Sequence, residues 1–193
     1  DLETALSYDL RHYSAYSLIL EEDTVLSEKF TSVDDELAVQ MYDLTAKMLN
    51  TRNLSRYEIS NYCAPGKHCR HNYDIWKGAS YLGVGPAAAS FDGTDRWIQI
   101  RDLKKWLNGH EPEIDKISQK TRLGEAIGFG FRTVNGWKIE ELKNLLGLNA
   151  LEIYQKAFKE LEELELIFLD KNSYKPTEKG LLFADTLAEA FIF

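Results

Sequence analysis

The segment Tyr57–Trp76 concentrates residues that could do chemistry. It holds two thiols, Cys63 and Cys69, and two imidazoles, His68 and His71. Thiolate and imidazole are ligands that zinc and iron prefer. The Cys-x5-Cys spacing, however, matches no common closed zinc site, and a chain with two cysteines cannot supply the thiolates of a four-iron cluster. We therefore interpret the segment first as a loop that lines a binding site, with a metal centre as the less favoured alternative.

His71 is the residue with the most specific chemistry in this segment. A neutral imidazole could bind a haem iron, with Asn72 beside it and the Trp76 ring packed against the porphyrin face. The alternative is that His71 fixes the loop through a hydrogen bond and that Trp76 belongs to the core. Glu58 carries a similar choice, because a strand carboxylate can face a cavity or can pair with a nearby arginine at the surface.

The elements that would position these residues form a strand, a helix and a strand. Tyr13–Leu20 is short, apolar and aromatic, which predicts a buried strand. A helix is expected from an N-cap at Ser32 to Met48, and a second strand over Tyr57–Tyr62. This order predicts a βαβ unit with parallel strands and a right-handed crossover.

The middle of the chain predicts shorter elements. A short helix or turn is expected to begin over His71–Trp76. Strands are expected over Tyr81–Val84 and Trp97–Ile100, and a helix over Arg101–Leu107 that ends at Asn108-Gly109. Glu111–Lys116 is polar and contains a proline, which is typical of a linker. We therefore expect a first domain over residues 1–112 and a second over 113–193.

The second domain has the pattern of helices followed by a hairpin. Helices are predicted over Arg122–Arg132, Ile139–Leu146 and Asn149–Glu165, followed by a hairpin over Leu166–Pro176 and a last helix over Thr177–Ala190. Three helices and a hairpin are the order of a winged-helix domain. The fold class predicted is α/β in the first part and mainly helical, winged-helix-like, in the second.

The net charge of the chain limits the classes of partner that it could bind. The net charge of −8 argues against nucleic acid and against an anionic membrane surface as partners. A winged-helix DNA-binding regulator is disfavoured further, because the helix expected over Asn149–Glu165 is mostly acidic. We find no apolar run of the ~18 residues that a transmembrane helix needs. With no signal peptide visible, we expect a cytoplasmic protein.

Several motifs resemble, in order and spacing, the oxygen-independent coproporphyrinogen III oxidase-like radical SAM proteins, and most closely their haem chaperone branch. The motifs are His12–Leu18, Glu21–Thr24, Tyr57–Tyr62, Pro65-Gly66, Cys69–Asn72, Trp76, Tyr81–Pro86, Arg101–Lys104 and Lys175–Leu182. The resemblance covers essentially the whole chain. It implies a partial (β/α) barrel that holds a [4Fe-4S] cluster and S-adenosylmethionine through a CxxxCxxC motif.

That cluster motif is absent from this chain. The resemblance therefore implies the C-terminal half of such a protein, with residues 1–112 as the C-terminal portion of the barrel. The intact parent would be a radical SAM oxidoreductase-like protein, and whether it turns over a substrate is left open. We expect this chain alone to be inactive and to hold no cluster, with haem as the one cofactor it could retain.

The resemblance also assigns site residues. His71, Asn72 and Trp76 fall on the haem-associated HNxxYW motif, in which Ile75 stands at the tyrosine position. Ile19 and Ala89 fall at positions that approach S-adenosylmethionine in the oxidase branch. Ala89 also stands where the chaperone branch usually has histidine.

The function expected is haem binding and transfer to an acceptor protein that the sequence does not identify. The alternative is radical oxidative decarboxylation of coproporphyrinogen III. Without upstream barrel strands, Tyr13–Leu20 would lie at an open sheet edge, with side chains such as Tyr16 and Leu18 exposed. Such an edge pairs readily with another chain, so we also expect self-association.

Overall fold

The computed structural model describes residues 1–22 and 24–192. Asp23, within the Glu21–Thr24 motif, therefore lies outside the described residues. The chain divides into two compact units, one over Asp1–Cys69 and one that begins at Arg70. Within the described ranges, no helix is long and apolar enough to cross a membrane.

The first unit is a small sheet beside a long helix. The strands lie in the order β1-β3-β2, and Tyr13, Leu49, Leu54 and Tyr62 form its core. The long helix starts where the Asp34 side chain accepts a hydrogen bond of 2.9 Å from the Leu37 amide. The elements are α1 (Leu2–Leu6), β1 (His12–Ser14), α2 (Val25–Lys29), α3 (Asp35–Asn50), β2 (Ser55–Arg56) and β3 (Asn61–Cys63).

The parallel pairing expected in this unit is wrong. β3 lies between β1 and β2 and runs antiparallel to both. The reason is a tight turn between β2 and β3, in which the Tyr57 amide donates 3.0 Å to the Asn61 carbonyl. The segment expected as one strand, Tyr57–Tyr62, is thus mostly this turn.

The other expectations for this unit hold in part. The long helix is present, but it begins at Asp35 and not after Ser32. The first strand ends at Ser14, and the remainder of Tyr13–Leu20 has no regular structure. Tyr16 and Leu18 are exposed there, as expected for an open edge, although the stretch as a whole was expected to be a buried strand.

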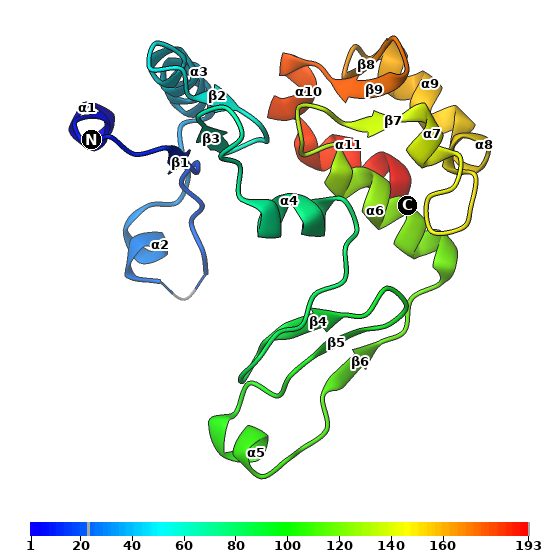
Figure 1. Cartoon of the computed structure of the whole chain (residues 1–193). Coiled ribbons are helices and arrows are strands. Elements are labelled where there is room, and N and C mark those ends of the chain that lie inside the picture. Colours follow the sequence, from blue (N-terminus) through cyan, green and yellow to red (C-terminus); the bar gives the residue numbers. More distant parts are fainter. Residues whose placement is uncertain (23, 193) are drawn as a thin grey trace. The chain divides into compact units, whose positions relative to one another are not determined.

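The second unit begins with α4 (Arg70–Trp76), the short helix expected near His71, and continues into a three-stranded arm. The strands of the arm are antiparallel in the order β4-β5-β6, with α5 between the last two. Figure 1 shows α5 at the end of the arm that lies away from the C-terminal helices. Its elements are β4 (Ala89–Phe91), β5 (Arg96–Ile98), α5 (Leu103–Leu107) and β6 (Glu113–Asp115).

Two predictions for the arm are wrong. Tyr81–Val84 forms no strand, and Tyr81 makes only an isolated bridge to Phe91. Glu111–Lys116 is not a linker, because it contains β6. One of the charged residues that suggested a linker is paired across the sheet: Asp115 accepts hydrogen bonds from Arg96 on β5.

The arm begins at a glycine that lies against the middle of α6. Gly78 has a φ of +85°, and a carbon added as its side chain would lie 3.9 Å from the Ala126 Cβ. The arm belongs to the unit that begins at Arg70. The domain division expected at residue 112 stays a prediction.

The C-terminal part packs helices against a small sheet, β7-β9-β8, in the winged-helix-like order expected. Helices α6 and α11 lie in close contact because Gly128 leaves room for Ala188. The predicted long helices are interrupted at Tyr154 and Phe183. The elements are α6 (Gln119–Gly130), β7 (Trp137–Lys138), α7 (Ile139–Leu142), α8 (Ala150–Ile153), α9 (Gln155–Glu163), β8 (Ile167–Asp170), β9 (Ser173–Pro176), α10 (Glu178–Leu182) and α11 (Ala184–Ile192).

Candidate functional site

Helix α4 carries the three haem-associated residues expected from the sequence. His71 is exposed near its start, whereas Asn72 and Trp76 are half-buried. The helix ends at Trp76. Two residues later, the Gly78 amide donates 2.9 Å to the Ile75 carbonyl, and the positive φ of Gly78 turns the chain away. The structure thus places all three residues on one short, well-terminated helix.

The end of α4 is held to the C-terminal helices by two cations. The Arg132 guanidinium lies 5.7 Å from the Trp76 ring centre, and the Lys77 Nζ lies 3.3 Å from that of Trp137. Lys77 Nζ also donates 2.7 Å to the Gly136 carbonyl and lies 3.4 Å from a Glu141 carboxylate oxygen. These contacts fix the orientation of α4 within the second unit, while His71 stays accessible.

The S-adenosylmethionine-proximal candidates lie in different units. Ile19 is 71% exposed in an irregular stretch of the first unit. Ala89 begins β4 in the second unit, where it pairs with Ile98. Their role near S-adenosylmethionine stays a prediction.

A hydrogen-bonded pair in the first unit escaped the sequence reasoning. His12 Nε2 lies 2.8 Å from the Tyr57 hydroxyl oxygen, which also accepts 3.2 Å from the Cys69 amide. Burial lowers the pKa of His12, against an opposing effect of the Glu58 carboxylate. Burial likewise raises the pKa of Tyr57. The two residues are 45 positions apart, so only the His12–Leu18 and Tyr57–Tyr62 motifs could have signalled them.

Glu58 is fully buried, so it is not a surface carboxylate, and it acts as a hydrogen-bond acceptor. Its Oε1 accepts 2.7 Å from the Ser60 amide and 2.5 Å from Asn61 Nδ2. Asn61 Oδ1 in turn accepts from the Ser14 hydroxyl on β1. Glu58 therefore builds the turn that brings β3 against β1.

The residues present do not fit a [4Fe-4S] cluster. The chain has two cysteines, of which Cys63 is buried and Cys69 is partly exposed. Burial raises the pKa of the Cys63 thiol, which disfavours the thiolate that binds metal. Among the described residues, no group of three or more His, Cys, Asp or Glu side chains could hold a metal ion.

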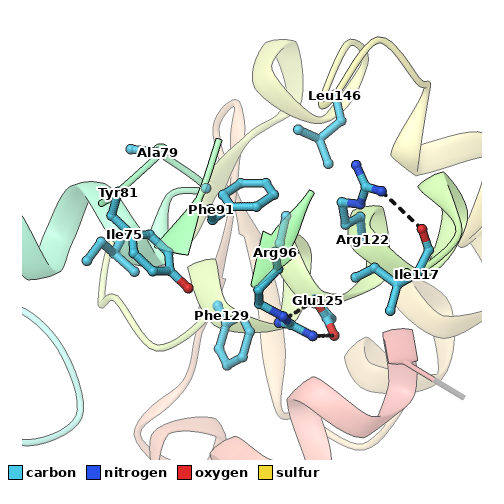
Figure 2. Close-up of a pocket in the computed structure, with 12 residues that line it drawn as sticks. Ile75, Ala79, Tyr81, Phe91, Arg96, Ile117, Arg122, Glu125, Phe129 and Leu146 are labelled. Carbon is cyan, nitrogen blue, oxygen red and sulfur yellow. Dashed lines mark hydrogen bonds and ion pairs between the residues drawn. The ribbon is translucent and has the colours of Figure 1, made fainter. Parts of the chain in front are cut away.

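A cavity of about 90 Å³ lies in the second unit, between the end of α4, the arm and α6. Figure 2 shows Tyr81, Phe91 and Phe129 along its apolar walls, and Arg96 and Arg122 among its charged residues. Its lining is Ile75, Gly78, Ala79, Tyr81, Phe91, Arg96, Ile117, Arg122, Glu125, Ala126, Phe129 and Leu146. Ile75, which stands at the tyrosine position of the HNxxYW motif, thus forms part of the cavity wall.

Comparisons with known proteins identify relatives of the chain. Residues 117–183 match the family model described as HemN C-terminal domain. The heme chaperone HemW of Lactococcus lactis is 25% identical over 201 residues, which are 100% of this chain and 53% of that protein. The mitochondrial radical S-adenosyl methionine domain-containing protein 1 of Bos taurus is 31% identical over 203 residues, 91% of this chain and 45% of that protein.

A solved structure shares the fold. It is described as coproporphyrinogen III oxidase (HemN) from Escherichia coli, a radical SAM enzyme. The TM-score is 0.61 at 14% identity, over 82% of this chain and 42% of that one. The fold is therefore that of the C-terminal half of a HemN-type radical SAM protein.

The relatives matched by sequence identify the branch of this class to which the chain is most similar. The chain spans about half the length of the curated relatives it matches. It belongs to the oxygen-independent coproporphyrinogen III oxidase-like radical SAM family, in the HemW-like branch, and corresponds to the C-terminal half.

Proposed function

We propose that this chain is the haem-binding half of a haem chaperone, with His71 as the ligand to the haem iron. The observation that supports the proposal is an exposed imidazole on a helix whose far end is fixed by Trp76 and Lys77. A fixed helix with an accessible imidazole can bind iron reversibly, as a carrier must. Relatives named heme chaperones match the whole chain.

In this proposal at most one face of the Trp76 ring contacts the porphyrin. One face of its ring lies against Arg132, so its main role is to hold α4 in place. Asn72, half-buried beside His71, would orient the imidazole or the bound haem. The parent would carry a [4Fe-4S] cluster and S-adenosylmethionine in its other half, and would pass haem to an acceptor protein in the cytoplasm.

Oxidative decarboxylation of coproporphyrinogen III is the second candidate, because the solved structure with this fold is described as coproporphyrinogen III oxidase. It would need cluster chemistry that the residues of this chain do not fit. A DNA-binding role is disfavoured, since both lysines of α9 are engaged by acids: Lys156 by Glu160 at 3.4 Å and Lys159 by Glu163 at 3.6 Å.

A haem titration of the 193-residue chain tests the proposal. We expect His71→Ala to lower haem affinity by about tenfold or more and to shift the Soret band, because an axial ligand is lost. His110→Ala is the matched control, since His110 is another exposed histidine and lies at the far end of the arm. Equal affinity and an unchanged Soret band in His71→Ala would exclude His71 as the ligand.

A further inference from the structure

Arg122 stands out among the residues that line the cavity described above. Its Nη2 donates 3.0 Å to the Ile117 carbonyl, as Figure 2 shows. Its Nε is buried and has no hydrogen-bond partner within the described residues. Leaving a buried donor of a charged group unsatisfied costs on the order of 1–3 kcal/mol or more, so an acceptor that reached this guanidinium would be stabilised.

The two arginines of the cavity differ in how fully acids neutralise them. Arg96 donates 2.9 Å to Asp115 from Nε and 3.2 Å to Glu125 from Nη1, so two carboxylates surround it. The nearest carboxylate to Arg122 is that of Asp95, at 3.9 Å and with its side chain 56% exposed. Arg122 is therefore the cation of this cavity that can take a further carboxylate.

The walls and the size of the cavity limit what that carboxylate belongs to. Apolar side chains from Ile75, Tyr81, Phe91 and Phe129 cover most of its surface. A volume of about 90 Å³ accommodates a short alkyl chain, but it is far too small for a macrocycle. The chemistry that fits is a short alkyl carboxylate, with its carbons on the aromatic walls and its oxygens on Arg122.

The cavity lies close to His71 along one helix. Ile75 lines the cavity and follows His71 by four residues on α4, so both side chains lie on the same helix face. Four residues rise by about 6 Å along a helix axis. A porphyrin held at His71 would carry its propionate arms over this region of the second unit.

We propose that this cavity binds a propionate arm of the tetrapyrrole, and that Arg122 receives its carboxylate. This inference rests on the proposed function for the tetrapyrrole, but the carboxylate site itself does not. Ile75 gives the pocket its room, because the tyrosine that the HNxxYW motif has at this position is larger.

The first experiment tests the site without haem. Sodium propionate is titrated into the full chain, with propionamide as the uncharged probe, and the methyl and aromatic resonances of Ala126, Phe91 and Phe129 are followed by NMR. We expect saturable shifts with propionate and none with propionamide. Arg122→Gln should abolish the response, whereas Arg101→Gln, at an exposed arginine outside the cavity, should retain it. No response of the wild type to propionate overturns the proposal.

The second experiment identifies the source of the carboxylate. Haem and haem dimethyl ester are titrated into wild type, Arg122→Gln and Ile75→Phe. We expect the wild type to bind the acid roughly tenfold more tightly than the ester, because a charge-assisted hydrogen bond is lost in the ester. Arg122→Gln should remove the difference by weakening only the acid. Ile75→Phe, which narrows the cavity and leaves Arg122 in place, should remove it too.

The outcomes separate this inference from the proposed function. Equal binding of acid and ester by the wild type overturns the propionate assignment, even where His71→Ala loses haem. If propionate binds but the three proteins show no difference between acid and ester, the pocket takes a free small carboxylate and the tetrapyrrole assignment is wrong. If haem binds none of the proteins, the proposed function fails, and the propionate titration still decides the site.

Discussion

Lys77 Nζ lies 3.3 Å from the centre of the Trp137 ring and donates 2.7 Å to the carbonyl oxygen of the preceding residue, Gly136. The lysine directly follows α4, and the tryptophan belongs to the core of the C-terminal helices. The position of α4, and with it the position of His71, therefore depends on a partly buried ammonium group.

The stability of the chain should carry a pH signature of this lysine. Burial lowers the pKa of Lys77 from 10.5 to about 8, although Glu141 opposes the shift. Below pH 8 both the folded and unfolded states bind the proton, and the cost of burial is fully present. Between the two values the unfolded state binds more protons, so the free energy of unfolding should rise with pH.

Urea unfolding of wild type and Lys77→Met at pH 7 and pH 10 measures this effect. We expect the difference between the two proteins, wild type minus variant, to increase by about 2 kcal/mol in favour of the wild type at the higher pH. Other titrating groups cancel because both proteins contain them. A difference that does not change with pH would contradict a lowered pKa in the folded state.

Glu58→Ala should destabilise the first unit by about 2–3 kcal/mol, because the Ser60 amide and the Asn61 side chain would lose a buried acceptor. Chemical denaturation measures the loss, and faster amide exchange at Asn61–Cys63 would localise it. Glu36→Ala, at an exposed acid in the first turn of α3, should change the stability little. Similar effects of the two substitutions would rule out a structural role for the Glu58 network.

Gly130→Ala should destabilise the C-terminal helices by more than about 2 kcal/mol, because an added side-chain carbon would meet the Trp137 ring. Gly109→Ala provides the comparison, since Gly109 has a φ of +71° and open space around it. It should cost only backbone strain, about 1 kcal/mol. Thermal unfolding of both variants checks the order, and a smaller loss for Gly130→Ala would refute the packing argument.

Self-association through the first unit is still expected. β1 lies at a sheet edge, and an apolar groove beside it includes Tyr16, Leu18, Leu37 and Met41, all of them exposed. Light scattering over a concentration series should show a rising mass, and Tyr16→Lys with Leu18→Lys should reduce it. A constant monomer mass for the wild type would count against the prediction.

Local signals in the sequence predicted local structure well. The β8–β9 hairpin and the start of α10 after Thr177 follow from turn and capping residues within a few positions. The antiparallel pairing of β3 could not be predicted in this way, because Glu58 and Asn61 create it through side-chain contacts. The expected linker failed for a similar reason, since Asp115 finds its partner in Arg96 across the sheet.

The candidate site shows the same contrast between residues that a local motif identifies and residues that only folding brings together. His71 was identified from a contiguous motif, and its place on α4 agrees with the expected short helix. The cavity was not identified, because its lining comes from segments as far apart as Ile75 and Leu146. No spacing rule connects such residues until the chain has folded.

Gly78 lies against Ala126 in the middle of α6, so the start of the arm is packed against the helix that follows the arm in sequence. Arg96 on β5 also pairs with Glu125 on α6, so a displacement of the arm would be transmitted to α6. The turn after α5, at Asn108 and Gly109, is correspondingly a place to insert a fluorescent reporter. Such a reporter would follow ligand capture from outside the helices.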